Sequence, residues 1–258
     1  MASQSDPMAE NLFSVAGHIA CVTGASSGLG RFVATALAQA GASVIGVARR
    51  ADALKEWQHP LGDKAGYICH DLMEGDGIAA AADKVSAVFG PPDIVVHAAG
   101  VNTRESADNV TAKGWEDTIW LNLTVPFFLS QQFVPAMKAQ KWGRIINFAS
   151  LQTVRAFPNG IAYGASKGGI GQVTRAMAEA WSGDGINANA IAPGFFPTEL
   201  TAPVFNDAGQ AARNASQTCI GRNGQLEDIK GPVLFLASKA SAYVTGHVLM
   251  VDGGFTAK

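Results

Sequence analysis

The sequence predicts a single α/β domain built on a doubly wound parallel sheet with helices on both faces. Short apolar runs rich in β-branched residues alternate with longer segments of helical periodicity along the whole chain. These runs are continuously apolar, which is typical of strands covered on both faces. The 258 residues contain no low-complexity linker and no internal repeat, so one domain over residues 1–258 is expected.

The predicted strands and helices alternate along the chain, as apolar runs alternate with segments of helical periodicity. Apolar runs lie at 18–23, 43–48, 66–71, 93–98, 144–149, 186–192, 233–237 and 247–252. Helical segments lie between them at 29–40, 52–57, 77–89 and 115–137, and a further helix opens near Tyr163. Pro126 lacks a backbone N–H, so we expect it to bend the segment 115–137.

Composition limits the partners and the compartment. Charged residues make up 16% of the chain and the net charge is -2, so no basic surface is expected for nucleic acid or anionic lipid. No apolar run approaches the roughly 18 residues that cross a membrane. The polar start has no signal core, and Cys21, Cys69 and Cys219 are expected to be core thiols. We expect a cytoplasmic protein with small-molecule ligands and a flexible extension over residues 1–14.

A glycine-rich turn follows the first strand in VTGASSGLG, residues 22–30. Gly24, Gly28 and Gly30 leave bare backbone where a strand ends and a helix begins, so a pyrophosphate could approach the helical N–H groups. This pattern indicates a dinucleotide-binding loop, although tight strand-to-helix turns also collect glycines.

Two arginines follow the second strand, about twenty residues beyond the glycine loop. A site for NAD would place an acid there against the ribose 2′-hydroxyl, whereas this chain has Arg49 and Arg50. A guanidinium suits a 2′-phosphate, so the sequence favours NADP, with NAD possible as an alternative. The other interpretation is that both arginines only solvate the start of the next helix.

The stretch AYGASKGG, residues 162–169, places a tyrosine and a lysine four residues apart. On a helix Tyr163 and Lys167 share a face, and a nearby ammonium is expected to lower the phenol pKa from its usual value near 10. A tyrosine tuned in this way can act as a general acid and base near neutral pH. A surface pair of the i,i+4 type is the simpler interpretation of these two residues alone.

Several motifs in fixed order make the chain similar to the short-chain dehydrogenase/reductase family over its full length. They are TGASSGLG, HDL, HAAG, LNL, Ser150, YGASK, PGFFPT at 193–198 and VDGG at 251–254. The resemblance implies a Rossmann fold, a dehydrogenase or reductase that acts on CH–OH groups, and a homotetramer, with a dimer as the alternative. His97 departs from the family pattern, which has asparagine there. We interpret His97 as a buried, hydrogen-bonded residue, and no metal site is expected.

The resemblance also assigns roles to site residues. Tyr163 would exchange a proton with the substrate, Lys167 would tune it, Ser150 would bond the reacting oxygen, and Asn122 would hold a relay water. Asp71 would bond the adenine amino group, and Thr198 the nicotinamide carboxamide. The residues expected to hold the cofactor are Gly24, Ser26, Ser27, Gly28, Leu29, Gly30, Arg49, Arg50, Asp71, Leu72, Ala98, Ala99, Gly100, Tyr163, Lys167, Pro193, Gly194, Phe196 and Thr198.

Two further arginines bear on the substrate. Arg104 follows the fourth strand and Arg155 lies five residues past Ser150, so both could receive a carboxylate, or both could be solvated loop residues. Their context is most similar to the gluconate 5-dehydrogenase branch, which implies a polar sugar acid, sugar or polyol as substrate. The alternatives are a 3-oxoacyl-thioester or general ketone reductase, and a non-catalytic cofactor-binding scaffold or sensor.

Overall fold

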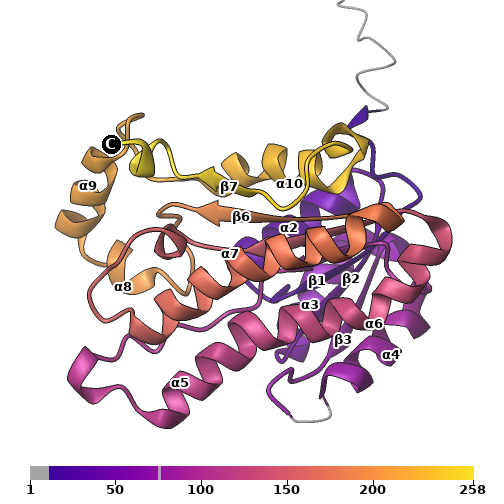
Figure 1. Cartoon of the computed structure of the whole chain (residues 1–258), viewed down its shortest axis with the longest axis horizontal. Coiled ribbons are helices and arrows are strands. Elements are labelled where there is room, and N and C mark those ends of the chain that lie inside the picture. Colours follow the sequence, from indigo (N-terminus) through magenta and orange to yellow (C-terminus); the bar gives the residue numbers. More distant parts are fainter. Residues whose placement is uncertain (1–11, 75–76) are drawn as a thin grey trace, which may run out of the picture.

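A computed structural model describes residues 12–74 and 77–258 of the chain, and seven parallel strands form its sheet (Figure 1). The strand order is β3-β2-β1-β4-β5-β6-β7. The strands are β1 (Ile19–Thr23), β2 (Ser43–Ala48), β3 (Ala65–Cys69), β4 (Ile94–His97), β5 (Gly143–Phe148), β6 (Ile186–Pro193) and β7 (Val248–Val251). The predicted doubly wound α/β fold is confirmed, because the strand order reverses between β1 and β4.

Helices cover both faces of the sheet, which explains why the strands are apolar throughout. On one face lie α2 (Gly28–Gln39), α3 (Ala51–Gln58) and α10 (Lys230–Ala237); on the other lie α4 (Gly77–Phe89), α6 (Val125–Gln140) and α7 (Ile161–Trp181). Strand β4 shows the alternation directly, since Ile94 and Val96 pack in the first cluster and Val95 in the second.

The structure corrects one expectation about an element and adds detail to another. The apolar run 233–237, grouped with the strands by its composition, forms most of helix α10. The helical segment 115–137 is interrupted before Pro126: α5 (Ala112–Ile119) leads into a π-helical turn at Trp120–Thr124, and α6 follows. Pro126 lies in the first turn of α6, directly after the π-helical turn, so the irregular part of this segment lies beside the proline.

The remaining helices and the termini complete the molecule. Helices α8 (Ala202–Phe205) and α9 (Ala208–Gln217) follow β6 and lie at the end of the molecule where the C-terminus also lies (Figure 1). Most of the expected extension over 1–14 falls outside the described residues, but the Phe13 ring lies 6.5 Å from that of Phe235. None of the helices in the described part of the chain is long and apolar enough to span a membrane.

The cysteines correct another expectation. Only Cys21 is a buried core thiol, in β1, and burial raises its pKa to about 12. Cys69 and Cys219 are exposed. Cys69 ends β3, where the strand leaves the covered part of the sheet, so an apolar run does not guarantee burial of its last residue.

Candidate active site

A cleft of about 880 Å³ opens where the parallel strands end, across the reversal of strand order between β1 and β4. Every residue predicted to hold the cofactor lines this cleft. Segments after six different strands, β1 to β6, contribute to it, because parallel strands present all their carboxyl ends at one edge. Among the described residues, no cluster of three acidic, histidine or cysteine side chains has the geometry to hold a metal ion.

The turn between β1 and α2 has no room for a side chain at two of its glycines. Gly24 has a φ of +73°, and a Cβ there would lie 2.8 Å from the backbone N of Ala99. A Cβ on Gly30 would collide with the carbonyl oxygen of Gly24. Ser27 precedes α2 but makes no capping bond, so the first N–H groups of that helix stay available to an anion. This cradle fits the pyrophosphate of a dinucleotide.

The two arginines after β2 have different surroundings. Arg49 is largely exposed and its Nη1 lies 3.7 Å from Oδ2 of Asp71. Arg50 donates to the hydroxyl groups of Ser26 (3.1 Å) and Ser27 (2.7 Å). Arg50 also forms a two-point ion pair with Glu199, at 3.1 and 2.9 Å. The glycine turn and Arg50 therefore form one group of donors at the cofactor end of the cleft.

Helix α7 begins two residues before Tyr163 and brings Tyr163 and Lys167 into the cleft on one face. The Lys167 Nζ donates to the carbonyl of Phe148 at 2.6 Å and lies 5.6 Å from the centre of the Tyr163 ring. Burial lowers the pKa of Lys167 to about 8. Packing accounts for Gly169, where a Cβ would lie 2.9 Å from Leu123, but not for Gly168, where a Cβ would meet nothing within 4 Å.

The expected lowering of the tyrosine pKa is wrong for the protein without ligand. Burial of the phenol raises the pKa of Tyr163 above its usual value, while the Ser150 hydroxyl and the charge of Arg104 act in the opposite direction. The Lys167 ammonium is bonded to the Phe148 carbonyl rather than to the phenol. Desolvation therefore outweighs the attraction that the i,i+4 spacing suggested.

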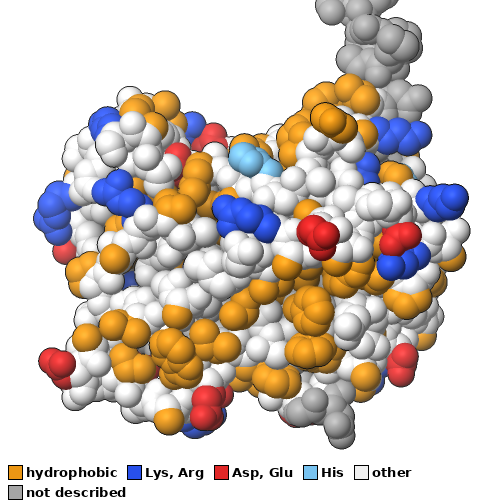
Figure 2. Space-filling model, viewed as in Figure 1, with side chains coloured by type: hydrophobic (Ala, Val, Ile, Leu, Met, Phe, Trp, Pro, Cys, Tyr) orange, Lys and Arg blue, Asp and Glu red, His pale blue; other side chains and the backbone are white. Residues whose placement is uncertain are grey.

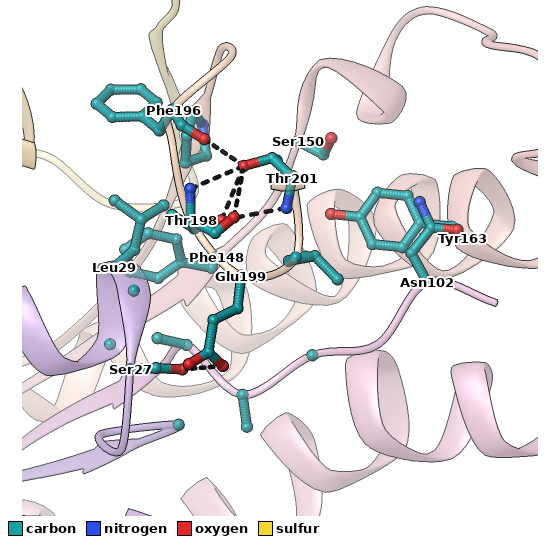
Figure 3. Close-up of a pocket in the computed structure, with 18 of the residues that line it drawn as sticks. Ser27, Leu29, Asn102, Phe148, Ser150, Tyr163, Phe196, Thr198, Glu199 and Thr201 are labelled. Atoms are coloured by element: carbon teal, nitrogen blue, oxygen red, sulfur yellow. Dashed lines mark hydrogen bonds between the residues drawn. The ribbon is translucent and has the colours of Figure 1, made fainter. Parts of the chain in front are cut away.

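Ser150 and Asn122 hold their places through backbone bonds. The Ser150 oxygen accepts from the N–H of Gln152 at 3.2 Å, which leaves the hydroxyl proton free to donate into the cleft. Figure 3 shows Ser150 and Tyr163 on one side of the pocket and Ser27 with Glu199 on another. Asn122 is buried in the π-helical turn and bonds both the N–H and the carbonyl of Val101 at 2.9 Å.

Comparison with known proteins agrees with this geometry. Residues 24–256 match a short-chain dehydrogenase model described as "Enoyl-(Acyl carrier protein) reductase". The 2-dehydro-3-deoxy-D-gluconate 5-dehydrogenase of Escherichia coli (strain K12) is 39% identical, over 95% of this chain and 98% of that protein. The chain belongs to the short-chain dehydrogenase/reductase family.

Two more members of the short-chain dehydrogenase/reductase family are similar to it. Gluconate 5-dehydrogenase of Gluconobacter oxydans (strain 621H) is 36% identical over 95% of this chain and 97% of that protein. A gluconate 5-dehydrogenase from Burkholderia cenocepacia J2315, solved in complex with NADP and tartrate, has a TM-score of 0.91 and 34% identity, covering 97% of this chain and 99% of that chain. The predicted family resemblance is confirmed.

His97, the departure from the family pattern, is buried as expected. Its Nε2 lies 2.7 Å from the Ser130 hydroxyl of α6, and burial lowers its pKa to about 3. The imidazole is therefore neutral at physiological pH and does not supply a charge to this short-chain dehydrogenase/reductase.

The two candidate substrate arginines separate in the structure. Arg104 lines the cleft and donates to the carbonyl of Leu200 at 2.9 Å. Arg155 does not line it, because its guanidinium lies over the ring of Phe255, 5.9 Å from the centre. The expectation that both arginines face the site is therefore wrong for Arg155, which is held by an aromatic ring outside the cleft.

Sequence reasoning missed part of the lining. Thr201 accepts from the N–H of Thr198 at 2.9 Å and also bonds the carbonyl of Phe196, so it fixes the turn after β6. The Thr-x-x-Thr spacing just after the PG turn is the signal that could have found it. Other lining residues not predicted include Asn102, Gln152, Phe157, Phe195, Glu199 and Asn214.

Proposed function

We propose that this chain is an NADP-preferring oxidoreductase that interconverts a secondary alcohol and a ketone, with a polar sugar acid, sugar or polyol as substrate. The observation that carries the proposal is the meeting of Ser150, Tyr163 and Lys167 in one cleft with an uncapped helix N-terminus and Arg50. An acid–base tyrosine beside a dinucleotide cradle suits hydride transfer coupled to proton transfer.

Residues of this chain carry out the proton transfer that accompanies the hydride transfer. The nicotinamide of the bound cofactor supplies the hydride chemistry. Ser150 has a hydroxyl proton free to bond the reacting oxygen, which polarises a carbonyl or orients an alcohol. Tyr163 gives its phenolic proton to that oxygen in reduction and takes it back in oxidation. A tyrosine with a raised pKa is protonated at neutral pH, so the unliganded enzyme is ready for reduction.

A path from Tyr163 to solvent is part of the proposal. Asn122 and Lys167 both border Gly100, where a Cβ would come within 3.2 Å of the Asn122 Oδ1 and 4.0 Å of the Lys167 Nζ. We propose that a water molecule near Gly100 connects these two polar groups. Lys167 can pass a proton to such a water because its pKa, about 8, is close to neutral.

Arg104 is the proposed contact for an acidic substrate. It lies in the cleft near enough to Tyr163 for its charge to act on the phenol. The relatives named above act on gluconate or on a deoxy derivative of it, and the Burkholderia enzyme was solved with tartrate, a dicarboxylate. These names support an anionic sugar-derived substrate for this chain. Because Arg104 lines the cleft and Arg155 does not, we propose that one arginine receives it.

Assembly and location are also proposals. Trp115, Phe128 and Ile161 are exposed apolar side chains of α5, α6 and α7, and Figure 2 shows hydrophobic side chains gathered on this face. An apolar face of this kind supports a homotetramer, with a dimer as the smaller alternative. The free, exposed thiols of Cys69 and Cys219 support a cytoplasmic location, because thiols stay reduced there.

The test is a panel of sugar acids, polyols, simple ketones and acyl thioesters assayed at fixed NADPH. We expect turnover of a sugar acid or its keto form and little turnover of the thioester. Rapid turnover of the thioester alone would favour the 3-oxoacyl reductase alternative, which the description of the matching family model keeps open.

Tyr163→Phe separates catalysis from binding. This variant should lose about 10²- to 10⁴-fold in kcat, as expected when a general acid is removed. Its affinity for NADPH, measured by fluorescence titration, should stay within about twofold. Turnover equal to wild type would refute the role of Tyr163, and absence of turnover in both proteins would support the non-catalytic scaffold.

A further inference from the structure

We propose that Glu199 is a cofactor-specificity residue: its carboxylate occupies the donors that would receive the 2′-phosphate of NADP, and the phosphate must displace it. The proposal rests on the proposed use of NADP. Glu199 follows β6, on the turn that also carries Thr198, whereas its partners lie on β1–α2 and β2–α3. The contact therefore joins two sides of the cofactor cleft.

The donors around Glu199 form a complete site for an anion. Ser27 donates its hydroxyl to Oε2 at 2.9 Å, and Arg50 contacts both carboxylate oxygens. Ser26 accepts from the same guanidinium and completes the group. Two-point contact with one guanidinium and a hydroxyl is the arrangement by which proteins recognise phosphate.

Arg50, rather than Arg49, is the cation that these bonds hold at the glycine turn. The Arg49 guanidinium lies beside Asp71, with Nη1 3.7 Å from Oδ2, and makes no hydrogen bond to another side chain or carbonyl within the described part of the chain. Arg50 follows β2, at the position where a ribose 2′-substituent is recognised in doubly wound folds. A 2′-phosphate that reached Arg50 would meet the donors already bonded to Glu199.

A carboxylate and a phosphate cannot share these donors. Two anions within about 4 Å repel each other, and the guanidinium has one fork to offer in that direction. The Arg50–Glu199 pair is half exposed, with side-chain exposures of 50% and 63%, so it is weak enough for a more highly charged ligand to break. Glu199 therefore reduces the affinity for the 2′-phosphate without excluding it.

The test uses Glu199→Gln, which keeps the shape of the side chain and removes its charge. Dissociation constants are measured by calorimetry for NADPH, NADH, adenosine 2′,5′-bisphosphate and 5′-AMP. The two adenosine fragments lack the nicotinamide and differ only in the 2′-phosphate, so the difference between their affinities reports the contribution of that phosphate. Glu56→Gln is the matched control, because Glu56 pairs with Arg31 at 3.2 Å outside the cleft and loses the same charge.

We expect Glu199→Gln to bind NADPH and the bisphosphate about two- to fivefold more tightly than wild type, the gain expected when an exposed ion pair need not be broken. Affinities for NADH and 5′-AMP should stay close to wild type, and Glu56→Gln should change none of the four.

Three results would overturn the proposal. They are unchanged or weaker NADPH binding in Glu199→Gln, equal tightening for 5′-AMP, or the same gain in Glu56→Gln. If wild type itself fails to prefer NADPH over NADH, the proposed cofactor preference is wrong. If wild type prefers NADPH and Glu199→Gln does not tighten it, only the role of Glu199 is wrong.

Discussion

Gly24 offers a direct test of how closely the glycine turn and the end of β4 approach each other. Gly24→Ala adds a Cβ at a φ of +73° that would lie 2.8 Å from Ala99 N and 2.9 Å from Ala98 C. Both neighbours are backbone atoms of the cofactor cleft, so they cannot rotate away as a side chain would. The substitution therefore combines backbone strain with a collision.

Two other glycines separate these effects. Gly221 has the same φ of +73° but nothing within 4 Å of a Cβ, so Gly221→Ala carries the strain alone. Gly30 lacks a positive φ, and its Cβ would meet the Gly24 carbonyl, so Gly30→Ala carries a collision alone. A positive φ costs an alanine about 1–2 kcal/mol, of which about 0.4–1 is regained from the unfolded chain.

These figures give a net loss of about 1 kcal/mol for Gly221→Ala. The collision adds about 1–3 kcal/mol, so Gly24→Ala should lose about 2–4 kcal/mol. Stability is measured by urea unfolding at fixed protein concentration, and NADPH affinity by fluorescence titration. Gly24→Ala should also bind NADPH more weakly, whereas Gly221→Ala should bind it as wild type does. Equal stability of Gly24→Ala and Gly221→Ala would refute the close approach.

Two further predictions concern charge near the acid–base pair. Arg104→Gln removes a positive charge that lowers the pKa of Tyr163, so the phenol pKa should rise and the pH profile of alcohol oxidation should move to higher pH. Arg155→Gln is the control. An equal shift of the pH profile in both variants would contradict a specific effect of the Arg104 charge on the Tyr163 pKa. Burial places the pKa of Lys167 at about 8, below the 10.5 of an exposed lysine, so the wild-type fold gains stability as pH rises through this interval. Lys167→Met has no ammonium and lacks this gain. Urea unfolding at pH 7 and pH 10 should therefore show that the free energy of unfolding of wild type rises relative to that of the variant. The same difference in free energy at both pH values would contradict a buried ammonium.

Much of the fold and most of the cofactor cleft could be predicted from the sequence. The hydrophobic periodicity of strands and helices predicts a sheet covered by helices on both faces. A parallel sheet brings the carboxyl ends of all its strands to one edge. The PG turn and the glycine loop are far apart in sequence but both follow strands, so their meeting in the cleft follows from topology. The run 233–237 was misassigned because a buried helix and a buried strand have the same apolar composition over five residues.

The electrostatics of the site could not be predicted, because they depend on distances between atoms that the spacing of residues in the sequence does not determine. The i,i+4 pattern places Tyr163 and Lys167 on one face, but it does not show that Lys167 bonds the Phe148 carbonyl. The pairing of Arg50 with Glu199 joins residues 149 positions apart. Arg155 is close to Ser150 in the sequence, but its guanidinium lies over the ring of Phe255.

The π-helical turn at Trp120–Thr124 makes this stretch sensitive to chain length as well as to residue type. Deletion of one residue there would remove the extra residue of the π-helical turn and rotate the positions before it by about 100° relative to α6. The Asn122 amide would then turn away from Val101 and Ser166, its present partners. A single-residue deletion, tolerated in many surface loops, would here displace the side chain for which we propose a role in the proton path.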